Sequence, residues 1–200
     1  AFSNIKTLLE EAKAIAPPDP PSPIIIEMGG TVNSLKKKGI KVTETGAKYT
    51  YSLNQVPKGN KKLKLYRALI TPNSGLCQLT AMTEFKDYNS FGLGLKTDFQ
   101  FFEKALNKKY GQNKKVDDVI PRSIWNKPED WMMGLYKKER MLVAYWDKST
   151  KANLPLNNIG YIQLRALAGN PYKGVIALRY DFINHDECLK EQDEASTSNL

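Results

Sequence analysis

The sequence is poor in the side chains that most often carry enzymatic chemistry. It holds one histidine, His185, and two cysteines, Cys77 and Cys188. The Cys and His spacings of zinc sites are absent, as are the P-loop, the dinucleotide-binding glycine pattern and the G-x-S-x-G nucleophile elbow. We therefore predict a protein that is not an enzyme, with no catalytic residues, metal or cofactor.

Long hydrophobic runs are also lacking. The longest apolar stretches, 23–28 and 141–146, fall far short of the roughly 20 residues that span a bilayer, so we expect a soluble protein. Hydrophobic residues still make up 41% of the chain, which is ordinary for a globular protein. A chain of 200 residues can bury a sizeable core as one compact domain.

Acidic residues are outnumbered by basic ones, 21 to 30, which leaves a net charge of +9. This surplus favours anionic partners, whether nucleic acid, a lipid surface or an acidic protein. We interpret most of the lysines as solvated surface, because Lys-rich surfaces serve solubility. The lysines in a predicted strand, Lys61, Lys62 and Lys64, are candidate binding residues.

Nucleic acid is the less favoured of these partners. Lys62, Lys64 and Tyr66 share one side of the predicted strand, as in sheet platforms for RNA. However, Ala68 and Ile70 continue that side as core residues. No RNP-type or helix-turn-helix pattern accompanies them.

Prolines divide the N-terminal part from the rest. Residues 1–15 have apolar side chains at three- and four-residue spacing, which predicts an amphipathic helix. Residues 16–23 contain five prolines and predict a stiff spacer. We assign 24–190 to a single domain and 191–200 to a flexible tail, because the tail is polar and small.

Within the domain, strand patterns dominate. Helices are predicted over 31–38, over Thr97–Tyr110 before Gly111, and over 126–140. Alternating or apolar runs predict strands at 24–28, on both sides of Gly46, and at 61–71, 75–85, 141–146, 159–167 and 174–183. The order predicts an α+β fold: a twisted antiparallel sheet of about 6–8 strands with helices on one face, and an N-terminal helical arm.

Cys77 is interpreted as structural. It alternates with Leu79 and Ala81, so its thiol should point inward, whereas a nucleophilic thiol needs a lowered pKa and usually exposure. His185 is expected in a solvated turn. A Cys77–Cys188 disulfide would close a loop of about 110 residues and stabilise the fold by roughly 4 to 5 kcal/mol. Two reduced buried cysteines are the alternative.

A disulfide and a chain beginning at Ala1 without Met are compatible with export and signal-peptide removal. We expect a periplasmic or secreted bacterial protein. The pairs Asp117/Asp118 and Glu129/Asp130 are expected at helix entries, where negative charge is favourable, and not in a catalytic site.

Aromatic and methionine side chains are dense around the second central helix. Most should be core, but Trp and Met also serve at adaptable recognition surfaces. The candidate binding residues here are Trp125, Trp131, Met132 and Tyr136.

Several segments together resemble uncharacterised small exported proteins of Gram-negative bacteria, over about residues 24–190. They are "GLCQLTAM", the helix ending "KKYG", "SIWNKPEDWMMGLYKKER" followed by "LVAYW", and "LRYDFINHDEC". In addition, "EMGGTVNSLKKKGIKV" looks like the glycine, short helix and strand unit of envelope proteins of the BamE and β-lactamase-inhibitor-protein kind. The N-terminal Cys of a lipoprotein is missing, and neither resemblance implies catalytic residues.

The favoured hypothesis is an exported protein that binds another protein, as an envelope accessory factor, inhibitor or immunity protein, with the positive charge favouring an acidic partner. One alternative is a protein that binds a peripheral anionic membrane surface or another polyanion. The other is a hydrolase that uses the carboxylates or Cys77.

Overall fold

The computed structural model describes residues 26–57 and 60–197, and the predicted helix 1–15 and spacer 16–23 lie outside them. The strands are β1 (Lys41–Glu44), β2 (Thr50–Asn54), β3 (Leu63–Thr71), β4 (Gly75–Thr83), β5 (Lys86–Asp87), β6 (Lys114–Val119), β7 (Arg140–Trp146), β8 (Ile159–Ala168) and β9 (Lys173–Phe182). The helices are α2 (Val32–Lys37), α3 (Leu93–Tyr110), α4 (Trp131–Tyr136), which follows the 3-10 turn η1 (Pro128–Asp130), and α5 (His185–Thr197).

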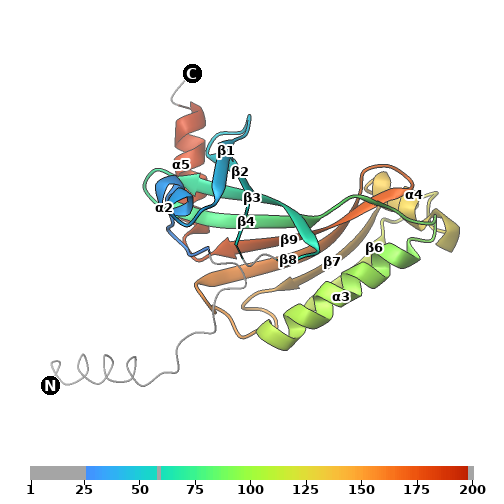
Figure 1. The fold of residues 1–200 in the computed structure, drawn as a ribbon. Helices are drawn as coiled ribbons and strands as arrows, with labels where there is room; N and C mark the ends of the chain where they lie inside the picture. Colours follow the sequence, from blue (N-terminus) through green and yellow to red (C-terminus); the bar gives the residue numbers. More distant parts are fainter. Residues whose placement is uncertain (1–25, 58–59, 198–200) are drawn as a thin grey trace, which may run out of the picture.

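All nine strands of the described chain join one antiparallel sheet, in the order β1-β2-β3-β4-β9-β8-β7-β6, with β5 paired to β9 (Figure 1). The predicted α+β class and antiparallel sheet are confirmed, but the strand number exceeds the expected 6–8. Residues 26–28 form no strand, which corrects the strand expected at 24–28 for its described part.

The sequence did not reveal the two-residue strand β5 or the longer strand β6. Asp117 and Asp118 lie on β6 and not at a helix entry, and they pair with Leu142 and Met141 of β7. β6 ends the sheet's strand order and is half-buried at most, so its sequence carries little apolar alternation. Glu129 and Asp130 do lie at a helix start, in η1 ahead of α4.

The main core lies between one face of the sheet and helices α3 and α4 (Figure 1). Strand β9 contributes Ile176, Leu178, Tyr180 and Phe182 to it, as their alternation predicts. The helix stripe expected on α3 is buried against these strands and consists of Phe99, Phe102, Leu106 and Tyr110. α3 begins at Leu93, four residues before the expected start.

The helix predicted over 126–140 is much shorter in the structure. Only the 3-10 turn η1 and the six-residue helix α4 form within that range. The chain adopts a left-handed conformation at Lys138, where φ is 62°. There the amide of Glu139 donates to the carbonyl of Gly134 at 2.9 Å, which is a hydrogen bond that ends helices. β7 can therefore start at Arg140.

Helix α5 packs on β3 and β4 from the face opposite α3, so the expectation of helices on one face is wrong (Figure 1). It also runs to Thr197, so residues 191–197, which were expected in a flexible tail, belong to this helix. The last turns are tied down because the Gln192 side chain donates to the carbonyl of Lys48 at 2.7 Å.

A β-bulge explains how α5 reaches Cys77. In the β3–β4 pair, Leu69 lies opposite Gln78 and Ile70 opposite Leu76, so Cys77 has no partner across the ladder. The extra residue turns Cys77 toward α5, where it clusters with Leu69 and Cys188. The predicted burial of Cys77 is correct, but the prediction that it shares a face with Leu79 is wrong.

Candidate binding surfaces

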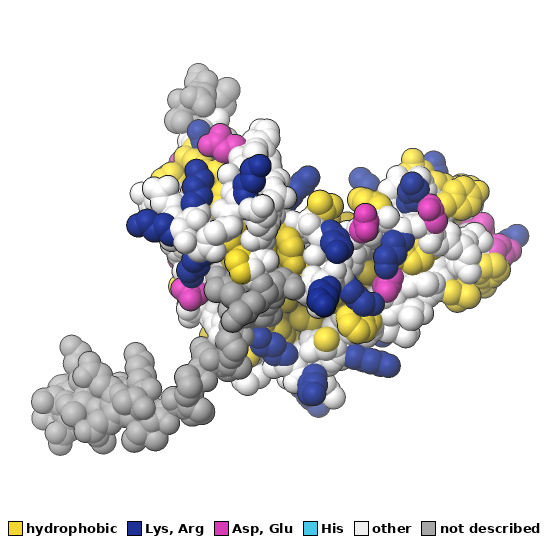
Figure 2. Space-filling view, viewed as in Figure 1, with side chains coloured by type: hydrophobic (Ala, Val, Ile, Leu, Met, Phe, Trp, Pro, Cys, Tyr) yellow, Lys and Arg dark blue, Asp and Glu magenta, His cyan; other side chains and the backbone are white. Residues whose placement is uncertain are grey.

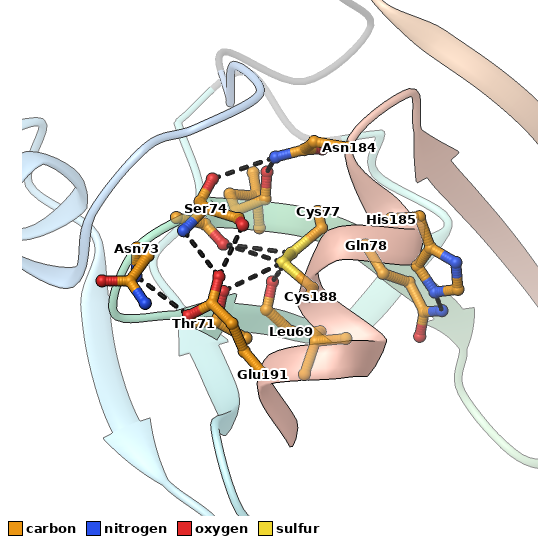
Figure 3. Close-up of a disulfide and its surroundings, with 12 residues drawn as sticks. Leu69, Thr71, Asn73, Ser74, Cys77, Gln78, Asn184, His185, Cys188 and Glu191 are labelled. Atoms are coloured by element: carbon orange, nitrogen blue, oxygen red, sulfur yellow. Dashed lines mark hydrogen bonds between the residues drawn. A yellow bond between two sulfur atoms is a disulfide. The ribbon is translucent and has the colours of Figure 1, made fainter. Parts of the chain in front are cut away.

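The two cysteines form a disulfide, Cys77–Cys188, as predicted (Figure 3). Both side chains are fully buried, and the bond joins β4 to the first turn of α5. Thr71 Oγ1 lies 3.1 Å from the sulfur of Cys188. Because its sulfur is bonded and buried, Cys77 is a structural residue in this state and not a nucleophile.

Glu191 holds the same helix to the turn between β3 and β4 (Figure 3). Its carboxylate accepts the backbone amides of Asn73 and Ser74 at 3.0 and 2.9 Å, and the Ser74 hydroxyl at 2.5 Å. Burial by itself would raise the pKa of Glu191, but these hydrogen bonds outweigh it and lower the pKa below its ordinary value.

The single histidine belongs to a polar network at the N-terminal end of α5. His185 is the first residue of that helix, with a side chain only 13% exposed, so the solvated turn expected for it is wrong. Its Nε2 lies 2.9 Å from Gln78 Nε2, and Gln78 donates to Asp181. Arg179 donates to both oxygens of Asp181 at 2.7 Å, which raises the pKa of Arg179. The network thus fixes the sheet to the start of α5.

Within residues 26–57 and 60–197, no group of three or more His, Cys, Asp and Glu side chains is placed to hold a metal ion. The helices of that same part of the chain are too short or too polar to cross a membrane.

A different surface lies at the end of the sheet away from the disulfide (Figures 1 and 2). We call it the loop end, and it comprises residues 84–93, 120–130, 136–141 and 169–173. Eight of the twelve large hydrophobic side chains that are exposed in the described chain lie there. They are Phe85, Phe91, Leu93, Ile120, Ile124, Tyr136, Met141 and Tyr172. Clustered exposed apolar side chains mark interaction surfaces, whereas single ones do not.

Hydrogen bonds connect the segments of the loop end. The amide of Tyr88 donates to the carbonyl of Tyr172 at 2.7 Å, and the amide of Met132 donates to Ser90 at 2.9 Å. Ile120 donates to the carbonyl of Glu139 at 2.7 Å. The loops that carry the exposed side chains are therefore linked to one another.

Ser123 fixes the loop that exposes Ile124, whose side chain is 74% exposed. The buried hydroxyl of Ser123 donates to Glu139 at 2.6 Å and accepts the amide of Trp125 at 3.1 Å. Ile124 therefore projects from a backbone that is held on both sides. Such preorganisation lowers the entropy cost of binding.

The four aromatic and methionine candidates divide between surface and core. Trp131 and Met132 are buried, with 2% and 0% exposure, and Lys96 lies over the Trp131 ring at 4.4 Å. Trp125 is half-buried and Tyr136 exposed, and both belong to the loop end. Sequence reasoning missed Ile120 and Ile124, because single apolar residues in a polar loop give no periodic signal.

The lysine candidates lie near the start of β3. Lys62 is 3.7 Å from Asp98 and 4.1 Å from the centre of the Phe101 ring, so its charge already has partners. Lys61 and Lys64 are exposed. Lys64 lies at a second bulge, between the pairs Leu63–Thr83 and Leu65–Met82.

No protein-family model, curated protein or solved structure matches this chain at a significant level.

Proposed function

We propose that this is an exported, non-enzymatic protein that acts by binding another protein, and that the loop end is its contact surface. The observation that carries the proposal is the concentration of exposed aromatic and aliphatic side chains at one end of the sheet. Binding energy in protein interfaces comes mostly from a few such anchors at the centre of the contact.

The charge of the loop end favours a protein over an anionic membrane. Its seven Lys and Arg residues are offset by five Asp and Glu residues, although the chain as a whole carries +9. Peripheral membrane sites that bind anionic lipid instead concentrate several basic residues in one cluster. An apolar surface of nearly balanced charge fits a protein partner.

Export is supported by the disulfide, because such bonds persist in oxidising compartments and are rare in the cytosol of mesophiles. We further propose that the protein uses this binding as an envelope accessory factor, an inhibitor or an immunity protein.

The proposal is tested by site-specific photo-crosslinking of the whole protein in an extract of its native envelope. A crosslinking amino acid replaces Ile124 or Tyr172, and the control replaces Lys148, which is exposed in the turn after β7 at the opposite end. We expect the same partner protein from positions 124 and 172, and no such product from position 148.

Competition shows whether the apolar contact is responsible. Excess wild-type protein should abolish the crosslink, whereas the Ile124→Asp variant should compete at least tenfold less well. Equal labelling from position 148 would contradict the proposal, and so would equal competition by the variant. Crosslinks only to lipid or to a second copy of this chain would replace it with a membrane-binding or self-association role.

A further inference from the structure

The residues that the structure describes leave one face of the sheet largely uncovered. Helices α3 and α4 pack on the opposite face, and α5 packs on this one mainly against β3 and β4 (Figure 1). The side chains of this open face follow from the strand register, because residues paired across strands point to the same side. We call this surface the open face.

Two rows of side chains cross the centre of the open face. The first contains Tyr145, Gln163, Arg179, Thr80 and Arg67, each paired with the next. The second contains Val143, Arg165, Ala177, Met82 and Leu65 in the same way. Neither row contains an acidic residue, and Asp181 of the next row is already bound by Arg179.

Arginine is concentrated on this face, although lysine is far more common in the chain. Three of the five arginines, Arg67, Arg165 and Arg179, lie on it. Within the described residues, Arg67 and Arg165 form no salt bridge, and both are exposed. The planar guanidinium group binds carboxylates through two parallel hydrogen bonds, which the ammonium group of lysine cannot do.

A groove of about 340 Å³ lies where α5 meets the open face. Arg67 lines it together with the polar side chains of Thr80 and Gln192. The apolar part of the lining includes Met82 and Leu189, and Leu189 is 40% exposed. The groove thus places a guanidinium group that has no salt-bridge partner in the described part of the chain beside aliphatic side chains.

We propose that the open face is a second binding site, which takes an acidic, aliphatic segment of a protein. Arg67 and Arg165 bind its carboxylates, and the groove beside Leu189 holds an adjacent aliphatic side chain. This site is separate from the loop end, so it does not depend on the function proposed above.

The groove favours a peptide over a nucleic acid. Proteins that bind single strands stack the bases on exposed aromatic rings and contact the phosphates with several basic residues. Among the described residues, the lining of the groove contains no aromatic side chain and one basic residue, Arg67. Aliphatic walls around a single guanidinium group instead match a Glu or Asp next to a Leu or Ile.

Fluorescence anisotropy with the full chain and defined peptides tests the site. The probe is a labelled ten-residue peptide of alternating Glu and Leu, and the comparison peptide alternates Gln and Leu. We expect the acidic peptide to bind at least tenfold more tightly. The double variant Arg67→Gln, Arg165→Gln should reduce its affinity about tenfold or more.

Matched variants separate this site from general attraction to positive charge. The double variant Lys36→Gln, Lys37→Gln removes the same charge from α2 and should change the affinity less than twofold. The Leu189→Asp variant should weaken binding about as much as the arginine variant does, without altering any arginine. Ile124→Asp should leave peptide binding unchanged, whether or not the loop end binds a protein.

Three outcomes would overturn the proposal. The first is a loss of peptide affinity in the Lys36, Lys37 variant that equals the loss in the arginine variant. The second is equal affinity for the Gln and Glu peptides. The third is tighter binding of a ten-nucleotide oligo(dT) than of the acidic peptide, dependent on the same arginines. The last would assign the open face to nucleic acid.

Discussion

Gly75, at the start of β4, shows how closely the backbone is packed at the disulfide end. Its φ is +66°, and a Cβ added there would collide with the backbone carbonyl of Gly29. At the next residue, the amide of Gly29 donates to the carbonyl of Leu76 and the amide of Leu76 donates to the carbonyl of Gly30, both at 2.9 Å. The segment before α2 is thus attached directly to β4.

Gly75→Ala should therefore lower the free energy of unfolding far more than an alanine in a left-handed backbone conformation does by itself. Gly39 is the matched control, because its φ is +81° and no atom lies within 4 Å of its added Cβ. We expect Gly39→Ala to lower the free energy of unfolding by about 1 kcal/mol. Gly75→Ala should lower it by about 3 kcal/mol or more, measured by urea unfolding. Equal losses would mean that the Gly29–Gly75 contact does not restrict the backbone.

At the scale of one element, α5 depends on sequence-distant contacts. Its sequence is mostly polar, and Cys188 is its buried residue. The disulfide, the Glu191 carboxylate and the His185 network fix it to the sheet (Figure 3). The helix then forms one wall of the groove on the open face.

The lowered pKa of Glu191 makes this attachment dependent on pH. A carboxyl group with a folded pKa below its ordinary value of 4.5 stabilises the fold fully above that value. The contribution is lost as the pH falls through the folded pKa. Glu191→Gln should lower the free energy of unfolding by about 1 kcal/mol at neutral pH, a small value because the site is partly solvated.

The difference between Glu191→Gln and the wild type should vanish in acid, as measured by urea unfolding at a series of pH values. Glu187→Gln, at an exposed acid of the same helix, is the control and should change stability little at any pH. If the stability difference between Glu191→Gln and the wild type persisted below the folded pKa, the carboxylate charge would not be the cause of that difference.

At the scale of the whole molecule, one core unites the sheet. Residues from α2, both N-terminal hairpins, α3, α4 and the last three strands belong to the same buried cluster. The disulfide then links positions 111 residues apart. Such a structure should unfold in one step, because the one other buried cluster of the described residues is the small group around the disulfide.

Removing the disulfide should lower stability without dividing this transition. The double variant Cys77→Ala, Cys188→Ala should lose about 4 kcal/mol, since the bond restrains a loop of more than half the chain. Tryptophan fluorescence and far-ultraviolet circular dichroism should give coincident unfolding curves. Separated curves in the oxidised wild type would show that the sheet contains two independent folding units.

The sequence by itself determined the elements whose patterns are local. The alternation in 174–183 predicts β9, the turn 72–75 predicts the β3–β4 hairpin, and the stripe from Phe99 to Tyr110 predicts the buried face of α3. Composition and cysteine number also predicted the disulfide. These features follow from side-chain periodicity and turn chemistry, which neighbouring residues set.

Only the tertiary structure decided which surfaces are open. The bulge at Cys77 and the contacts of Glu191 place α5 opposite α3, and no local pattern specifies either. The same holds for the strand pairing that places Arg67, Arg165 and Arg179 on one face, and for the buried Ser123 that fixes the loop of Ile124. Faces and ends of a sheet are formed by residues far apart in the chain, so register and packing determine them.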